Sequence, residues 1–128
     1  MELVRRSILG WNEQGVEAFV EVLDPSVEFH PPVESMNPGV YRGHEGVRDY
    51  FGRLSEVVQD QRVESVDVIE VDEDRVIATV RAFARSAHFE EEVELRWSYL
   101  VVVQDGKATH VQTFVDRAAA LEAAGLSR

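Results

Sequence analysis

Hydrophobic residues change their spacing once along this chain, near Asp60. Before that point, apolar side chains recur at steps of three and four, which is typical of one face of a helix. After it, apolar and polar residues alternate with a period of two, which is typical of strands with one buried face. The pattern predicts two or three helices followed by a meander of antiparallel strands. Helices segregated from an antiparallel sheet indicate an α+β domain.

The first half of the chain predicts three helices and one short strand. The first helix runs from Met1 to Trp11, and a bend over Asn12–Gly15 leads into a second helix. That second helix ends at Asp24-Pro25, because the residue before a proline disfavours the helical conformation. The segments predicted next are a strand at Val27–His30, a loop at Pro31–Arg42, and a helix that starts near Gly43-His44 with an apolar stripe from Val47 to Val58.

The second half predicts four long strands and a final helix. The strands are Arg62–Val71, Arg75–Arg85, Val93–Gln104 and Ala108–Val115, with turns at Asp72–Asp74 and Ser86–Glu92. Asp105-Gly106 between the last two strands is a dipeptide favoured in tight hairpins. Asp116 suits the N-cap of a short helix over Ala118–Ala124, which Gly125 ends. One strongly curved sheet wrapped over the helices would enclose a cavity, with its mouth where the Val27–His30 strand empties into the long loop.

Composition narrows the classes of partner. The 128 residues suit a single domain over 1–128, and the formal charge of -11 argues against nucleic-acid binding, since an acidic surface repels phosphates. No signal peptide, apolar stretch of about 18 residues or basic amphipathic helix is present, so we expect no membrane association and a cytoplasmic protein. The absence of cysteine excludes disulfides, thiolate metal sites and a cysteine nucleophile.

Motifs spread over nearly the whole chain match one family in their order. They are Trp11-Asn12, Leu23–Pro25, Val27–His30, Val40–Val47, Asp105–Lys107 and Phe114–Ala118. Through these motifs the chain resembles the SnoaL-like proteins of the NTF2-like superfamily, which includes polyketide cyclases and ketosteroid isomerases. The resemblance implies a cone-shaped α+β barrel, with N-terminal helices packed in a strongly curved antiparallel sheet, an apolar pocket and a homodimer. Characterised relatives act on small apolar carbonyl compounds without metal or organic cofactor, so the resemblance implies no cofactor here.

His30 is the candidate general base. Allowing a one-residue gap, the resemblance places it where ketosteroid isomerases carry a general-base aspartate, and imidazole performs the same proton transfer. Ser7 stands where those enzymes have a first-helix tyrosine, so their oxyanion hole is absent. The alternative is a histidine that closes a strand and bonds to loop backbone.

Tyr99 is the candidate hydrogen-bond donor to a ligand carbonyl. It lies two residues from Trp97 in the long strand, so both side chains point to one face. The resemblance places a glutamine and a histidine of polyketide cyclases at these two positions, and their catalytic aspartate at Thr113. Because threonine is no carboxylic acid, a faithful cyclase is not expected. The alternative is that Trp97, Tyr99 and Thr113 only fill the barrel.

The predicted pocket wall combines helix, loop and strand residues. They are Trp11, Phe29, Tyr41, Phe51, Trp97, Val101 and Thr113. For Trp11 and Tyr41 the alternative is plain core packing. Arg81 interrupts an apolar strand and reaches either the cavity or the dimer face, where a buried arginine requires an acidic partner from a neighbouring strand.

Metal binding is not expected. The four histidines, His30, His44, His88 and His110, form no pair at ligand spacing on one element. His44 lies at a helix start, where the dipole disfavours positive charge, so a neutral structural role is expected for it.

Two functions remain open at this point. In the first, a pocket accommodates a small, largely apolar molecule and performs cofactor-free isomerase-type or cyclase-type acid–base chemistry, with His30 as base and Tyr99 as donor. In the second, the same fold is a non-catalytic binding or interaction module. The second predicts that His30 and Tyr99 do not converge on one point, or that packing fills the cavity.

Overall fold

The computed structural model describes residues 2–32, 39–86 and 91–126, and its elements follow the order of the sequence pattern. The helices are α1 (Glu2–Leu9), α2 (Trp11–Gln14), α3 (Val16–Val20), α4 (Gly43–Leu54) and α5 (Arg117–Ala123). The strands are β1 (Leu23–His30), β2 (Tyr41–Arg42), β3 (Val58–Glu70), β4 (Arg75–Ser86), β5 (Glu92–Gln104) and β6 (Lys107–Phe114). Parts of the predicted loop Pro31–Arg42 and turn Ser86–Glu92, and also His88, lie outside the described residues.

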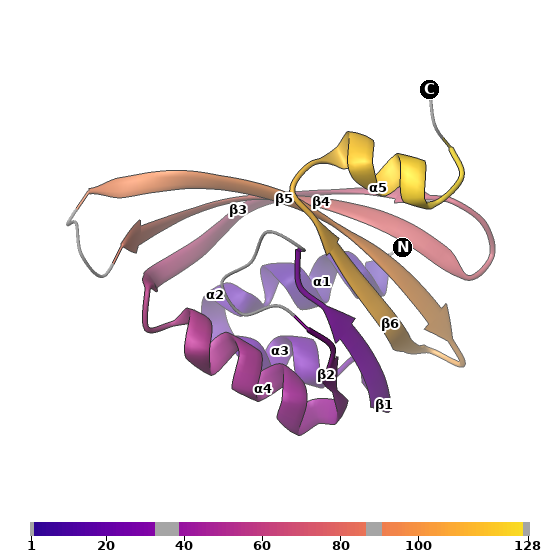
Figure 1. The fold of residues 1–128 in the computed structure, drawn as a ribbon, viewed down its shortest axis with the longest axis horizontal. Helices are drawn as coiled ribbons and strands as arrows, with labels where there is room; N and C mark the ends of the chain where they lie inside the picture. The colour runs from indigo at the N-terminus through magenta and orange to yellow at the C-terminus, as the bar shows by residue number, and fades with distance from the viewer. Residues whose placement is uncertain (1, 33–38, 87–90, 127–128) are drawn as a thin grey trace.

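All six strands belong to one curved sheet, in the order β2-β1-β6-β5-β4-β3. The sheet bends over α1 to α4, while α5 lies on its opposite face (Figure 1). The predicted α+β class is therefore confirmed, with a sheet that curves without closing. Strands β3 to β6 form the predicted antiparallel meander. Strand β1 instead runs parallel to β6, with Phe29 opposite Val111.

The prediction for the second helix was wrong at its end. Helix α3 stops at Val20 and the chain is already a strand at Leu23. Leu23 pairs with Ala108 of β6 and is only 6% exposed, so its apolar side chain enters the core from a strand. The ladder between β1 and β6 is irregular between Leu23 and Glu28, which lets Pro25 lie within a strand without removing a regular ladder bond.

The boundary after α4 also differs from the prediction. The helix ends at Leu54, and β3 begins at Val58, four residues before the predicted Arg62. Val58 had been counted as the last member of the helical stripe, but it pairs with Ser86 of β4. The two-residue strand β2 lies in the predicted loop and pairs with β1.

The core lies on the concave side of the sheet. Val27, Val47, Val76 and Val80, from β1, α4 and β4, are fully buried there. Complete burial of such a side chain contributes about 1.5–3 kcal/mol. A smaller cluster on the other face joins Ile77 and Leu100 of the sheet to Ala120 and Ala124 at α5. Leu100 is therefore covered by the chain's own last helix, which explains why β5 is apolar on both faces at this point.

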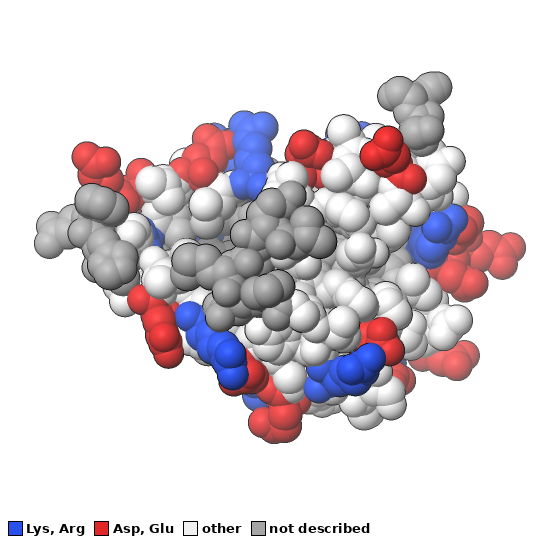
Figure 2. Space-filling model, viewed as in Figure 1, with Lys and Arg blue, Asp and Glu red and all other residues white. Residues whose placement is uncertain are grey.

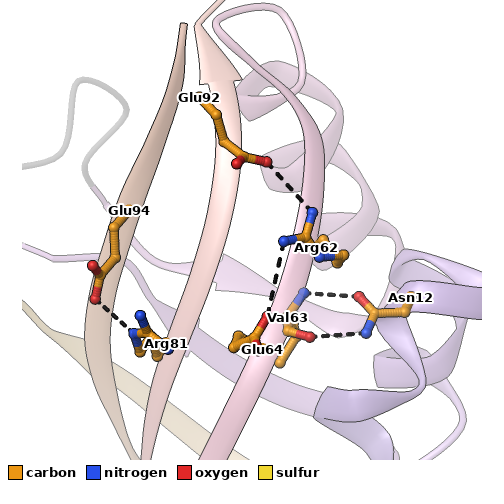
Figure 3. Close-up of polar contacts among 7 residues, drawn as sticks. All are labelled: Asn12, Arg62, Val63, Glu64, Arg81, Glu92 and Glu94. Carbon is orange, nitrogen blue, oxygen red and sulfur yellow. Dashed lines mark hydrogen bonds and ion pairs between the residues drawn. The ribbon is translucent and has the colours of Figure 1, made fainter.

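Trp11 and Asn12 fasten the N-terminal helices to the sheet. The Asn12 side chain accepts a hydrogen bond from the Val63 amide (2.8 Å) and donates to the Val63 carbonyl (2.9 Å), as Figure 3 shows. The Trp11 indole donates to the Gln61 carbonyl (3.2 Å). This pair of motif residues thus has a structural role at the junction of α2 and β3.

Two predicted local signals are confirmed. Asp105 (φ 53°) and Gly106 (φ 78°) both have the left-handed backbone that a tight type I′ hairpin requires. Asp116 caps α5, because its carboxylate accepts a hydrogen bond from the Ala119 amide at 2.9 Å.

Arg81 lies on the outer face of the sheet. Its guanidinium donates to Glu94 of β5 at 2.8 Å and lies 5.0 Å from the centre of the Phe83 ring (the ion pair is drawn in Figure 3). The expected acidic partner on a neighbouring strand is therefore present. Hydrogen bonds from Arg81 and Arg96 hold the pKa of the Glu94 carboxyl below its usual range. This part of the outer face is charged rather than apolar.

The acidic residues are distributed over the surface. In the view of Figure 2, Asp and Glu side chains lie around the outline of the molecule and do not gather into one patch. None of the described helices is both long and apolar enough to cross a membrane.

Candidate functional site: a cavity beneath helix α4

A cavity of about 250 Å³ lies between α4 and the concave face of the sheet. Most of its wall is apolar, and the wall residues come from α4 and from four strands. They are Phe29, Pro32, Tyr50, Phe51, Leu54, Val58, Gln61, Leu95, Arg96, Trp97, Tyr99 and Thr113. Packing has therefore not filled the space enclosed by the sheet.

Packed aromatic rings make one wall of the cavity rigid. The ring of Phe29 lies 5.1 Å from Tyr50 and 5.6 Å from Phe51, and these last two rings meet edge to face at 5.1 Å. Such offset and edge-to-face arrangements are the favourable ones for aromatic pairs. Phe51 also packs on Trp11 at 5.3 Å, which supports it from behind. The wall is thus formed before any ligand arrives.

Two residues with hydroxyl groups are neighbours in the cavity wall. Tyr99 on β5 and Thr113 on β6 face each other directly across the antiparallel ladder, so their side chains are neighbours on one face. Burial raises the pKa of the Tyr99 hydroxyl well above its usual range, although a hydrogen bond with the Trp97 side chain acts in the other direction. Tyr99 is therefore a neutral hydroxyl that keeps its proton to donate.

Thr113 contributes a polar atom that has no partner in the described parts of the chain. Its residue is 8% exposed, and its Oγ1 is buried without a hydrogen bond. An unmade hydrogen bond at a buried hydroxyl costs about 1–3 kcal/mol. The cavity next to it offers the space for an external hydrogen-bonding group.

The cavity wall holds no carboxylate and no imidazole among the described residues. Its polar side chains are the hydroxyls of Tyr50, Tyr99 and Thr113, the indole of Trp97 and the amide of Gln61, whereas the Arg96 guanidinium is bonded to Glu94. Each of these groups can hold a ligand oxygen, but none is a base suited to take a proton from carbon near neutral pH.

Four of the seven expected wall residues line this cavity: Phe29, Phe51, Trp97 and Thr113. The candidate donor Tyr99 lines it too. Val101 lines a smaller space of about 40 Å³, which shares Phe29 and Tyr99 with the main cavity.

The other two expected wall residues do not line this cavity. Trp11 borders a neighbouring hollow of about 250 Å³, which shares Phe51, Leu54, Val58 and Gln61 with the cavity. Tyr41 packs on Tyr50 at 5.2 Å. Both rings thus contact aromatic residues of the wall.

Several wall residues were not anticipated from the sequence. Leu95 has the same parity as Trp97 and Tyr99, so the two-residue period was a usable signal for it. Tyr50 and Leu54 belong to the apolar stripe of α4 and were assigned to the core only. Pro32, Val58, Gln61 and Arg96 carry no pattern that points to a cavity.

His30 lies on the other side of the sheet from Tyr99. Successive side chains of a strand point to opposite faces, so the inward position of Phe29 directs His30 outward. There its ring stacks on His110 at 5.0 Å, and its Nε2 lies 3.5 Å from a Glu28 carboxylate oxygen. The expected pairing of His30 with Tyr99 around one ligand therefore does not agree with this geometry.

His44 has the structural environment that its position in the sequence suggested. Its Nε2 lies 2.8 Å from the Leu23 carbonyl oxygen and links the start of α4 to the start of β1.

The fold and cavity match a known family. The profile of the SnoaL-like domain family matches residues 4–111 of this chain. The protein belongs to the SnoaL-like domain family. No curated protein sequence matches this SnoaL-like domain.

Solved structures resemble the SnoaL-like domain along nearly its whole length. An NTF2-like protein of unknown function from Burkholderia pseudomallei has a TM-score of 0.79 at 17% identity, over 95% of this chain and 94% of its own. TerC, co-crystallised with polyporic acid, has a TM-score of 0.78 at 23% identity, over 97% and 96%. A Xanthomonas campestris protein provisionally named a polyketide cyclase has a TM-score of 0.77 at 16% identity, over 90% and 88%. At these identities the likeness establishes a shared fold.

Proposed function

We propose that this SnoaL-like domain binds a small, largely apolar molecule in the cavity beneath α4 and holds a carbonyl or hydroxyl oxygen of that molecule at Tyr99 and Thr113. The observation that carries the proposal is the buried Oγ1 of Thr113, which has no hydrogen-bond partner among the described residues, on a residue that lines the cavity directly across the ladder from Tyr99. A few convergent polar groups in an otherwise apolar pocket are typical of small-molecule sites.

The size of the cavity limits the ligand class. At about 250 Å³ it is smaller than the roughly 300–1,000 Å³ of pockets for drug-sized ligands. One- and two-ring ketones and phenols fit this limit. They combine an apolar body for the Phe29, Phe51 and Leu95 surfaces with an oxygen for the two hydroxyls. TerC and a ketosteroid isomerase-like protein from Catenulispora acidiphila were crystallised with polyporic acid and trimethylamine respectively, which supports ligand binding on this fold.

Binding without catalysis is the version of the function that the geometry favours. Proton abstraction next to a carbonyl requires a base within about 3 Å of the carbon-bound proton. His30, the expected base, lies on the opposite face of the sheet, and the described cavity wall offers no replacement. Tyr99 in this account binds the ligand oxygen and does not have to transfer its proton.

A thermal-shift screen tests the proposal. Wild type is melted with a panel of one- and two-ring ketones and phenols and with polyporic acid, because a ligand at 100 times its Kd stabilises the native state by about 2.7 kcal/mol. We expect at least one ketone or phenol to raise the Tm of the wild type, and the shift to persist in His30→Ala and shrink in Thr113→Val. Absence of any Tm shift across the panel contradicts binding in this cavity. A Tm shift that is lost in His30→Ala and kept in Thr113→Val contradicts the assignment of the binding site to the cavity.

A homodimer in the cytoplasm is the remaining part of the proposal. It is supported by the family and by the exposed apolar side chains Val93 and Val115, which are 44% and 49% exposed. Light scattering during size exclusion measures the oligomeric state directly. A mass near twice 14.5 kDa is expected, and a mass near 14.5 kDa contradicts dimerisation.

A further inference from the structure

A second group of chemically active side chains lies away from the cavity, on the outer face of the β1–β6 pair. Glu28 and His30 are two residues apart on β1 and share that face. His110 of β6 stands opposite Glu28 in the parallel ladder. One potential ligand atom from each of the three lies within 4.8 Å of the other two. Residues far apart in the sequence thus meet because β1 and β6 are neighbours.

The distances within this cluster do not correspond to hydrogen bonds. One carboxylate oxygen of Glu28 lies 3.5 Å from His30 Nε2 and 3.6 Å from His110 Nε2. His30 Nε2 is buried and has no hydrogen-bond partner among the residues that the structure describes. A buried ring nitrogen without a partner destabilises the folded state, so a group that binds it contributes stability as well.

The same distances are close to those between ligands of one metal ion. With metal–nitrogen and metal–oxygen bonds of about 2.0–2.2 Å, the ligand atoms of a tetrahedral site lie roughly 3.3–3.5 Å apart. One ring nitrogen of each histidine lies within 4.8 Å of the other, so the two rings would have to turn towards each other to complete that geometry. The side chains of His30, Glu28 and His110 are 29%, 37% and 45% exposed, so an ion has a path from solvent.

The arrangement of charges is compatible with a cation. The two imidazole rings are stacked at 5.0 Å with an angle of 19° between their planes, beside the Glu28 carboxylate. Coordination would add one divalent ion beside that carboxylate. Among the described residues, Arg42 forms an ion pair with the same carboxylate at 3.9 Å, and its side chain is 69% exposed.

We propose that Glu28, His30 and His110 form a three-ligand site for Zn²⁺, with the remaining coordination position open to solvent. Two imidazoles and one carboxylate are ligands that suit zinc and its neighbours among the transition metals, whereas Ca²⁺ and Mg²⁺ prefer sites made of oxygen alone. The four histidines form no pair at ligand spacing on one element, which was the ground for expecting no metal site. This group escapes that criterion because its two histidines lie on neighbouring strands and its third ligand is a glutamate.

Isothermal titration of the full, untagged chain with Zn²⁺ at pH 7.5 tests the site. We expect one equivalent to bind per chain, and His110→Gln and Glu28→Gln each to weaken binding at least about tenfold, since each removes a direct ligand. The matched controls are His44→Gln and Glu56→Gln, which remove one imidazole and one carboxylate elsewhere and are expected to bind as the wild type. Failure of the wild type to bind one equivalent at micromolar concentrations, or equal binding by all four variants, overturns the proposal.

A measurement on the wild type alone guards against variants that fail to fold. Nitrogen-15 NMR of the histidine rings is expected to show Zn²⁺-dependent shifts at His30 and His110 and none at His44, whose Nε2 is already bonded to the Leu23 carbonyl. Shifts at His44 without shifts at His30 and His110 contradict the assignment. Because protons compete with the metal for the same ring nitrogens, the affinity is expected to fall as the pH is lowered from 7.5 to 5.5.

Discussion

Replacement of Thr113 by valine is predicted to stabilise the empty protein and weaken its ligand binding at the same time. Valine has nearly the shape of threonine, so the variant removes the hydroxyl and leaves the packing intact. In the folded wild type the residue is 8% exposed, and its hydroxyl is buried without a partner in the part of the chain that the structure describes. Folding therefore removes it from water without a new hydrogen bond, at a cost of about 1–3 kcal/mol.

The expected size of the two effects follows from that cost. Relief of the unmade hydrogen bond should raise the free energy of unfolding of Thr113→Val by about 1 kcal/mol, which is a rise in Tm of about 3–5 °C for a domain of this size. The lost contact to a ligand oxygen is worth about 0.5–1.5 kcal/mol, so Kd should rise about 2- to 12-fold. Most single substitutions destabilise a protein, so a gain of this size is a specific outcome.

Urea denaturation without ligand and calorimetric titration with a ketone or phenol hit measure both quantities on the same samples. A loss of stability in Thr113→Val, together with an unchanged Kd, would refute the reasoning. That result would mean that the hydroxyl has a structural partner and does not face the ligand. Ser7, which bonds to the Val4 carbonyl at 2.9 Å, provides the control variant Ser7→Ala, for which no gain in stability is expected.

Three further predictions concern other parts of the account. Because burial raises the pKa of Tyr99, its hydroxyl keeps its proton, and ligand affinity should be constant from pH 6 to 9. Tyr99→Phe should weaken that affinity. In titration calorimetry across this range, a collapse of affinity near pH 8 would contradict the prediction. Asn12→Ala removes two hydrogen bonds to Val63 and should lower the unfolding free energy, measured in urea, by about 2 kcal/mol. A loss below about 0.5 kcal/mol would contradict the role of Asn12 in fastening α2 to β3. The lowered pKa of Glu94 adds stability above pH 4.5, and this stability disappears as the pH falls through the folded-state pKa. Arg81→Met should therefore flatten the pH dependence of the unfolding free energy, measured in urea, below pH 4.5. An unchanged pH dependence contradicts this.

The meander of strands was predictable because apolar and polar residues alternate along much of each strand, even though α5 also buries Ile77 and Leu100 on the outer face. The alternation along β3 to β6 and the left-handed pair Asp105-Gly106 determine consecutive pairings over short distances. The start of β1 was not predictable in the same way. Leu23 continues a helical spacing, and only its pairing with Ala108, 85 residues later, makes it part of a strand.

The two faces of β1 explain both the success and the failure at the candidate site. Phe29 was expected at the cavity and lines it, while the adjacent His30 was expected there too and lies on the opposite face. The two-residue period was sufficient to separate them. The meeting of His30 with His110 depends on the parallel pairing of β1 with β6, which leaves no local pattern in either segment.

Which aromatic ring borders the cavity also depends on tertiary packing. Trp11, Phe51 and Tyr41 were all expected at the cavity, but of these three only Phe51 borders it. Which ring of a packed cluster meets the empty space depends on how α4 sits against the sheet. Periodicity identifies the buried face of a helix and does not identify the part of that face that is left unpacked.

The central claim is that a ligand enters the cavity beneath α4, and methyl NMR of the isotope-labelled protein tests it most directly. Leu54, Val58 and Leu95 line the cavity, while Leu121 packs on the opposite face of the sheet. Titration with the strongest binder from the ketone and phenol panel is predicted to shift the methyl signals of the first three residues and leave those of Leu121 unchanged. Shifts centred on Leu121, or no shift at any of the four residues, would contradict the account.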